Sequence, residues 1–430
     1  MLAFAIFTDK SVALAQRSVA PSHNYDFQRD CHPESSQNAQ AGHQACDKFK
    51  GLVFNPEAFG ANGNDDLDDS VAIQATFDCM RHKSKISAAK SAVVRFPPGR
   101  FVFDHPVSLA GITWREIHGL TIAGEGPQVT VLASRNDKGV LHLDFKQRRH
   151  TVTLQGLRFE PTKRGSGTAF EMTQISGGNQ HRRSLIMRDV EFTPNPEEKN
   201  YFDVAVRLHG AWRPLIDNVM VAGPFGPRVS NEDIYAMRVC FQLEESYNPT
   251  LVNAKCWSAK TGLAVVSSKP PGKRGPEGLM VTLSNFVMVK TGILLETGSI
   301  EPGAFISHSH VNASETGILM KNRRFGIISN NLFYFGGPRR QVHTQTYKDI
   351  RLVNSELTTI NDNIFHVPIR DKDYDGDRIM IELDNSRNCL LSQNMFNSPG
   401  IAVVEKGDSQ GNSVNQNFFL RGVKHSERER

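Results

Sequence analysis

The sequence of 430 residues predicts an all-β fold, a single-stranded right-handed parallel β-helix whose N-terminal end is capped by one α-helix. Two observations and one physical argument lead to this prediction. Helical hydrophobic patterns almost disappear after residue 100. Short β-rich runs separated by Gly, Asn, Ser and Pro then recur, and they align as a repeat of 21 to 35 residues. A repeat of this length without a helix can bury its apolar face only by stacking on its neighbours.

The repeat is anchored by asparagines, with one histidine in the series: Asn218, Asn253, Asn285, His310, Asn331, Asn363, Asn394 and Asn417. Phenylalanine follows four of these anchors two residues later, at Phe333, Phe365, Phe396 and Phe419. We expect the asparagines to stack at one turn, where Asn tolerates the left-handed backbone conformation, and the phenylalanines to fill the interior. A leucine-rich repeat would need a Leu-x-Leu-x-x-Asn register and a propeller about 40 residues per blade, so both alternatives are weaker.

One segment near the N-terminus has a helical pattern. Residues 65–69 read DDLDD, and Val71, Phe77 and Met80, with Ile73 nearby, then form an apolar stripe at helical spacing. The pattern predicts a helix over 69–80, with the acidic cluster at the N-terminus that the helix dipole favours. Because an open solenoid end would expose core and strand edges, we expect this helix to cap the first coil.

Residues 17–50 are polar and rich in Ser, Gln, His and Asn. We expect 1–50 to be a leader and loosely ordered arm, and 51–425 to be the β-helix domain. Ala13-Leu14-Ala15 is a small-x-small sequence like those cut by signal peptidase, which predicts a secreted or periplasmic protein. The apolar run before it is short and contains Asp9 and Lys10, so an ordinary N-terminus is the alternative. No stretch reaches the roughly 20 apolar residues of a membrane span.

The six cysteines are too few and too scattered to form a disulfide scaffold. If the protein is exported, we expect two of the three N-terminal ones, Cys31, Cys46 and Cys79, to pair. Free or buried thiols are the alternative.

The net charge and the motifs bear on the partners and cofactors of the protein. The net charge of +5 does not require nucleic acid as a partner and is compatible with an acidic polymer as substrate. The chain has no Walker loop, no GxGxxG and no CxxC, so no cofactor is predicted, although scattered aspartates leave calcium open.

His308 and His310 have the spacing of a metal pair, but His310 occupies a repeat anchor. We therefore interpret it as a turn residue and predict no metal site.

Three segments resemble the opening blocks of one known family. Residues 59–74 (FGANGNDDLDDSVAIQ), 94–99 (VRFPPG) and 120–126 (LTIAGEG) are similar to the signature of the rhamnogalacturonase/epimerase-like pectate lyase superfamily, with Asn64 and Ser70 as departures. The resemblance implies a right-handed β-helix with a carbohydrate polymer lying along one flank. It also implies that the acidic residues 65–69 are structural. The family includes lyases, hydrolases, epimerases and phage tailspikes, so it does not define the reaction.

One set of strands is expected to carry the site, because in related enzymes the strand after a Thr-Gly or Asp-Gly turn forms the floor of the active groove. Its members are 204–210, 240–246, 262–268, 292–298, 317–323, 349–355, 378–384 and 400–406. Side chains alternate along a strand, and the apolar ones must point inward. The outward residues are then Arg207, His209, Gln242, Glu244, Glu296, Lys321, Arg351, Glu382 and Asp384.

We assign catalysis to Glu244, Glu296 and Lys321, and substrate binding to the other six. Glu244 and Glu296 fall two rungs apart, near 10 Å at about 4.8 Å per rung, which suits the acid and base of an inverting glycosidase. Glu296 and Lys321 could instead be a solvated ion pair of little energetic value. A lyase would use Lys321, Arg207 and Arg351 to take a proton and neutralise a uronate.

The sequence therefore predicts a polysaccharide-degrading enzyme that cleaves glycosidic bonds of an acidic polysaccharide by hydrolysis or β-elimination. The alternative is a non-catalytic carbohydrate-binding protein or tailspike-like adhesin. A homotrimer is a possible assembly of the protein. The chain ends at HSERER without a trimerising extension, which favours the enzyme.

Overall fold

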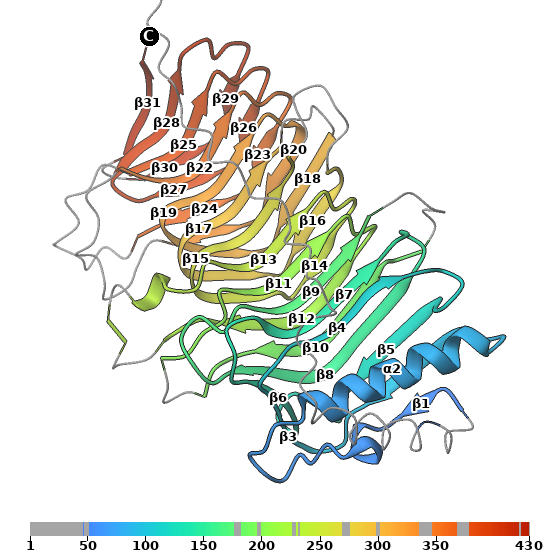
Figure 1. Ribbon diagram of the computed structural model, residues 1–430. Coiled ribbons are helices and arrows are strands. Elements are labelled where there is room, and N and C mark those ends of the chain that lie inside the picture. Colours follow the sequence, from blue (N-terminus) through green and yellow to red (C-terminus); the bar gives the residue numbers. More distant parts are fainter. Residues whose placement is uncertain are drawn as a thin grey trace, which may run out of the picture.

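The computed structural model describes Cys46 and residues 51–175, 182–195, 199–225, 229–230, 233–268, 276–297, 302–334, 346–367, 378–420 and 423–429. The chain winds into a parallel β-helix, in which each coil contributes strands to three ladders (Figure 1). We call these ladders sheets A, B and C, in the order in which a coil passes through them. Every pairing between their strands is parallel. The predicted fold class is therefore confirmed.

Sheet A consists of β4 (Val107–Ile112), β7 (Gly139–Phe145), β9 (Thr168–Gln174), β11 (Val204–His209), β13 (Val239–Glu244), the second halves of β15 (Lys255–Val266), β17 (Asn285–Glu296) and β19 (His310–Lys321), and β22 (Tyr347–Val353), β25 (Arg378–Asp384), β28 (Gly400–Lys406) and β31 (Val423–Glu429).

Sheet B consists of β1 (Val53–Phe54), β2 (Ser91–Arg95), β5 (Gly119–Ala123), the first halves of β8 (Thr151–Pro161), β10 (Leu185–Phe192) and β12 (Leu215–Ala222), and β14 (Thr250–Val252), β16 (Leu279–Thr282), β18 (Pro302–Ser307), β20 (Arg324–Ser329), β23 (Thr359–Asn361), β26 (Leu390–Ser392) and β29 (Ser413–Asn415).

Sheet C consists of β3 (Gly99–Phe103), β6 (Thr130–Ser134), the second halves of β8, β10 and β12, the first halves of β15, β17 and β19, and β21 (Leu332–Tyr334), β24 (Ile364–His366), β27 (Met395–Asn397) and β30 (Phe418–Phe419). Two short 3₁₀ helices, η1 (Pro56–Phe59) and η2 (Asp233–Tyr235), lie outside the ladders.

A column of phenylalanine rings fills the C-terminal half of the interior. Phe333, Phe365, Phe396 and Phe419 stack face to face, with centroid separations of 5.0, 5.0 and 5.3 Å between successive rings. This confirms the predicted Phe stack. At the Thr-Gly turns the next coil comes too close for a side chain: a Cβ added at Gly262 would lie 2.5 Å from the Gly292 carbonyl oxygen and 2.5 Å from the ring of Phe286. Glycine is therefore required there for successive coils to stack.

The predicted asparagine ladder is confirmed at four of its eight positions. Asn331, Asn363 and Asn394 each donate a side-chain hydrogen bond of 3.0 Å to the Oδ1 of the next member, and Asn417 ends the series. Each Nδ2 also donates to a backbone carbonyl of the preceding coil, for example Asn363 to Ile328 O at 2.9 Å. The buried ladder therefore satisfies polar backbone groups at the corner between sheets B and C.

The other anchors belong to different rows, which corrects the predicted alignment. Asn218 and Asn253 lie at the turn position one residue before the ladder, and their φ angles are positive, 52° and 49°. Asn285 pairs with His310, and His310 with Leu332, one residue beyond the ladder. Ser284 and Ser309 occupy the ladder position in those coils. Like the ladder asparagines, each accepts a hydrogen bond through its side-chain oxygen from the backbone N–H of the residue at the same position in the preceding coil. The left-handed residue is thus not the stacked asparagine but its predecessor.

The capping helix α2 (Ser70–Ile86) covers the first coil, as predicted, and extends six residues beyond the predicted end (Figure 1). Its residues Ile73, Phe77 and Met80 are fully buried in the core. Gln74 fixes the helix to β4 by donating to the Ser108 carbonyl at 3.0 Å and accepting from the Ser108 N–H at 2.9 Å. The helix therefore closes the open end of the solenoid.

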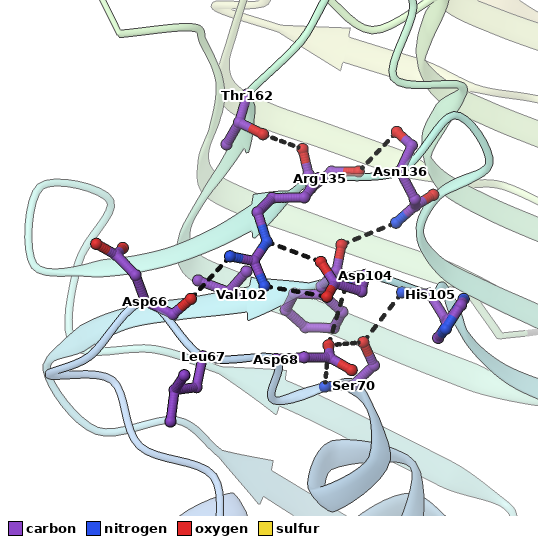
Figure 2. Close-up of polar contacts among 12 residues, drawn as sticks. Asp66, Leu67, Asp68, Ser70, Val102, Asp104, His105, Arg135, Asn136 and Thr162 are labelled. Carbon is purple, nitrogen blue, oxygen red and sulfur yellow. Dashed lines mark hydrogen bonds and ion pairs between the residues drawn. The ribbon is translucent and has the colours of Figure 1, made fainter.

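The acidic segment 65–69 lies at the N-terminus of α2, as predicted, with Asp69 at the N-cap position, and it joins the helix to the first coil. Asp69 accepts hydrogen bonds from the backbone N–H groups of Asn62 at 2.7 Å and Val102 at 2.8 Å. Asp68 accepts from the backbone of Ser70 and of Asp104, both at 3.0 Å (Figure 2). These carboxylates tie the start of the helix to β3, which agrees with the structural role that the family resemblance implied.

Two disulfides join residues that are distant in sequence. Cys46 and Cys79 are bonded, which confirms that two of the three N-terminal cysteines pair, and their Cα atoms are 5.5 Å apart. Cys240 and Cys256 form a second, unpredicted bond between β13 and β15. Cys389 is free and buried.

The N-terminal arm and its signal-like sequence lie outside the described residues, apart from Cys46. No helix in the described part of the chain has both the length and the hydrophobicity that a membrane crossing requires.

His150 makes the stability of the fold sensitive to acid. The residue is 1% exposed, its ring lies 4.6 Å from that of Phe145, and neither ring nitrogen makes a well-aligned hydrogen bond to a described residue. Burial lowers the pKa of His150 to about 4, although the Ile117 backbone lies close enough to favour the charged form slightly. The imidazole of His150 therefore takes up a proton less readily in the folded protein than in the unfolded chain, where its pKa is near 6.5.

We predict that the free energy of unfolding decreases as the pH falls from about 6.5 to about 4, by up to ~3 kcal/mol from this residue. Denaturant titrations of wild type and His150→Leu across this range would measure the effect, since the variant should lose the part of the slope that His150 contributes. The exposed His105→Asn change serves as the control. An unchanged slope in His150→Leu would contradict the assignment.

Candidate functional site

The outward side chains of sheet A form two parallel rows. Strand register places the first row at His142, Glu171, Arg207, Gln242, Ala264, Leu294, Leu319, Arg351, Glu382 and Val404. The second row is Asp144, Thr173, His209, Glu244, Val266, Glu296, Lys321, Val353, Asp384 and Lys406. All nine residues predicted to point outward lie in these rows, and Glu244 and Glu296 are two rungs apart as predicted.

Arg207, His209 and Glu244 form a connected group on β11 and β13. Arg207 donates from Nε and Nη2 to the two oxygens of Glu244, both at 3.2 Å. The Nδ1 of His209 lies 3.4 Å from Glu244 Oε2, and Gln242 donates to Glu244 Oε1. The Nη1 of Arg207 is also 3.5 Å from Glu171. Glu244 is therefore the centre that orients an arginine and a histidine.

The environment of Glu244 determines its ionisation. Burial alone would raise the pKa of this carboxyl, but the hydrogen bonds from His209 and Arg207 and the charge of Arg207 outweigh burial and lower its pKa to about 2. Glu244 is thus an anion at neutral pH and is not available as a proton donor. The arrangement instead favours the His209 tautomer that has its proton on Nδ1, which leaves Nε2 as a base.

Four residues of this face were missed in the sequence: His142, Asp144, Glu171 and Thr173. They occupy the two coils before Arg207, so that together with Arg207, His209, Gln242 and Glu244 they make a polar patch across four consecutive rungs. We call these eight residues the N-terminal patch. Their strands read GVLHLDF and TAFEMTQ, with the same alternation as the later strands, so extending the strand set to residue 139 would have found them.

Some polar atoms of the N-terminal patch are buried but have no hydrogen-bond partner in the described part of the structure. They are His142 Nε2, Asp144 Oδ1 and Gln242 Oε1. Buried polar atoms are usually satisfied by protein or by ordered water.

Glu296 and Lys321 form a separate pair further along the second row. Lys321 Nζ donates to Glu296 Oε1 at 2.9 Å, and the Glu296 side chain is 51% exposed. This is the geometry of the solvated pair that the sequence left as an alternative, and such pairs contribute little to stability. The catalytic roles assigned to Glu244, Glu296 and Lys321 are untested by the geometry and stay predictions.

A second charged group surrounds Glu382 on β22, β25 and β28. Arg351 Nε lies 2.6 Å from Glu382 Oε1, in ion-pair contact without good hydrogen-bond alignment, and Arg351 Nη2 donates to Asp384 at 3.0 Å. Lys348 and Lys406 approach the other Glu382 oxygen at 3.8 and 3.6 Å. We call these five residues the C-terminal cluster.

Glu382 is the one predicted binding residue whose accessibility the structure contradicts. It lies in the outward row, but its side chain is only 1% exposed because the three cations of the cluster surround it. It therefore cannot contact a substrate directly. Arg351 and Asp384 remain partly exposed at 34% and 22%.

Within the described ranges, no group of three or more His, Cys, Asp or Glu side chains is arranged to hold a metal ion. His310 is not the satisfied turn residue that was predicted. It begins β19, burial lowers its pKa, and its Nε2 is buried without a hydrogen-bond partner among the described residues. Calcium binding is untested.

No protein-family model and no curated protein matches the sequence. The chain is similar to solved structures that are right-handed parallel β-helices. The chain resembles the A-module of a mannuronan C-5 epimerase of Azotobacter vinelandii at 15% identity and a TM-score of 0.53, covering 87% of this chain and 99% of that one. It also resembles a DFA-IIIase of Arthrobacter chlorophenolicus at 11% identity and a TM-score of 0.54, covering 88% and 91%.

A third similar structure is the surface adhesin PfbA of Streptococcus pneumoniae, at 14% identity and a TM-score of 0.51, with 87% of this chain and 93% of that one covered. Identities this low establish the fold and nothing finer. Because enzymes and an adhesin match about equally well, the choice of function depends on the residues of sheet A.

Proposed function

We propose that the protein binds an acidic polysaccharide along sheet A and cleaves it by β-elimination, with the N-terminal patch as the active site. The observation that carries this proposal is the Arg207–Glu244–His209 group. Its side chains point away from the core, so folding does not require them, yet a half-buried carboxylate holds an arginine and a histidine side by side. This combination places a base beside an arginine, and a bound uronate would replace the longer contact of Arg207 with Glu171.

Elimination accounts for these residues better than hydrolysis does. An inverting hydrolase needs one carboxylic acid that stays protonated near neutral pH. The pKa of Glu244 is lowered to about 2, which excludes Glu244 as that acid and leaves it the roles of an ionised group. An orienting carboxylate, in contrast, must be ionised, and Glu244 fulfils this condition.

In the proposed reaction, Arg207 pairs with the uronate carboxylate and makes the proton on C5 more acidic. His209 Nε2 takes that proton, the electron pair forms the C4–C5 double bond, and the C4–O bond breaks. The protonated imidazole then returns the proton to the departing oxygen, so the base is regenerated. Glu244 acts as a positioning residue, because it contacts Arg207 and His209 and not the sugar.

We also propose that the protein is exported. Disulfides form and persist in oxidising compartments and are rare in the cytosol. The Cys46–Cys79 and Cys240–Cys256 bonds both fit this location, which is also where extracellular polysaccharides occur.

A non-catalytic adhesin is the second candidate, since an adhesin is among the similar structures. Incubating the protein with a panel of acidic and neutral polysaccharides distinguishes the two. We expect ultraviolet absorbance of unsaturated uronate ends from an acidic polymer. New reducing ends without that absorbance would indicate a hydrolase, exchange of the C5 proton without cleavage an epimerase, and binding without either an adhesin. Each of these three results would overturn the elimination.

A further inference from the structure

The segments that connect sheet A to sheet B beside the N-terminal patch are rich in arginine. Residues 146–150, 175–184 and 210–214 follow β7, β9 and β11 in three consecutive coils, and their sequences contain one lysine and no Asp or Glu. Their arginines are Arg148, Arg149, Arg182, Arg183 and Arg213. The N-terminal patch itself has three carboxylates against one arginine, Arg207. It would therefore repel a polyanion unless neighbouring cations offset these charges.

Arg148 reaches from its own coil to the end of the strand that carries the proposed base. A Cβ added at Gly210, which directly follows His209, would lie 3.5 Å from Nη2 of Arg148. The guanidinium also lies over the ring of Tyr247 in the turn after β13, 5.2 Å from its centroid. Trp212 stacks on the same ring at 5.1 Å. These contacts position the guanidinium just beyond the ends of β11 and β13.

The Arg148 guanidinium has no anionic partner among the described residues. It makes no hydrogen bond or ion pair with them, and only its Nε is buried, so that Nη1 and Nη2 can reach a ligand. The carboxylates on the adjoining elements are in contact with other groups. They are Glu116, Asp144, Glu244 and Glu245. Because a guanidinium presents its donors in a rigid fork that matches a carboxylate, Arg148 is prepared to bind one.

We propose that Arg148 binds a carboxylate of the polysaccharide, on a sugar other than the one that reacts, and thereby restricts the substrate to acidic polymers. This inference rests on the proposed function, in which Arg207 pairs with the reacting uronate. Arg148 is then a specificity-determining residue that takes no part in the proton transfer. The other arginines of these segments attract the polymer at longer range, an effect that salt screens.

The test compares Arg148→Gln with wild type in binding to polygalacturonate and alginate, and to a neutral form of each polymer in which the carboxyl groups have been reduced to alcohols. For the acidic polymers we expect the dissociation constant to rise at least about tenfold, the scale of losing a hydrogen bond between charged groups. For the neutral polymers it should not change, because they lack the anion. Arg148→Lys keeps the charge but not the fork, so its affinity for the acidic polymers should be intermediate.

Two matched controls accompany Arg148→Gln. Arg95→Gln removes the same charge from an exposed residue of sheet B and should bind like wild type. Arg149→Gln removes the exposed neighbouring cation, and its smaller effect should disappear as salt is added. The effect of Arg148→Gln should persist, because salt screens a partly buried pair less. Thermal melting checks that each variant is folded.

Equal losses of affinity for acidic and neutral polymers would overturn the inference, since they would show that Arg148 has only a structural role. Unchanged affinity for the acidic polymers, an equally large effect of Arg149→Gln, or failure of wild type to bind either acidic polymer would overturn it as well. If wild type binds but cleaves nothing, the proposed function fails. The dissociation constants then still decide whether Arg148 recognises the carboxylate.

Discussion

Phe365→Ala is expected to destabilise the protein by ~3–5 kcal/mol, the usual cost of truncating a fully buried phenylalanine. Phe365 is 0% exposed and lies between Phe333 and Phe396, with ring centroids 5.0 Å away on both sides. Its removal leaves a cavity in the middle of the stack. Each coil depends on its neighbours for burial, so the loss affects the coils on both sides. The midpoint of chemical denaturation measures this effect.

The neighbouring residue on the same strand provides the control. Ile364 points outward from β24 and is 42% exposed, so Ile364→Ala should change the midpoint little. Glu296→Gln on sheet A should also be close to wild type, since its ion pair is exposed. If Phe365→Ala and Ile364→Ala melted at the same temperature, the assigned in-and-out register of sheet C would be wrong.

The fold could be predicted because stacking imposes the same requirement on every coil. A large apolar residue must recur at the same position of each coil to fill the interior. The series from Phe333 to Phe419 shows this recurrence in the sequence. The exact row of a polar residue at a turn could not be predicted by spacing alone. Ser284 and Ser309 satisfy the same backbone groups as Asn331, so the ladder changes residue type without changing function. Coil lengths also vary, which shifted Asn285 and His310 by one position.

The site was predicted in part. Strand alternation placed Arg207, His209 and Glu244 on one face, because inward positions must be apolar and the remaining ones face out. Alternation does not reveal how deeply an outward residue is covered by its neighbours. Glu382 is buried by cations that come from two other strands, and no feature of its own strand indicates this. The low pKa of Glu244 likewise arises from contacts between strands.

Removal of the proposed base should abolish most of the activity without affecting folding. His209→Ala is expected to lower kcat by at least ~100-fold, which is the lower range for loss of a general base. Its side chain is 43% exposed and outward, so the melting temperature should stay close to that of wild type. The exposed His82→Ala change on α2 controls for loss of a histidine elsewhere. Unsaturated uronate formation on the polysaccharide identified in the panel measures the rate.

Two further measurements separate a chemical role of His209 from a structural one. Added imidazole should restore part of the rate of His209→Ala, since a small base can occupy the space that the side chain leaves. Glu244→Gln should lower kcat more than it raises KM, because the amide keeps the shape of the carboxylate but no longer fixes Arg207 and His209 by charge. If elimination occurs here, Glu296→Gln should be nearly silent. Full activity of His209→Ala, together with a large loss in Glu296→Gln or Lys321→Ala, would contradict this assignment. The reaction would then take place at the Glu296–Lys321 pair, two to three coils beyond Glu244 on sheet A, which the sequence first indicated.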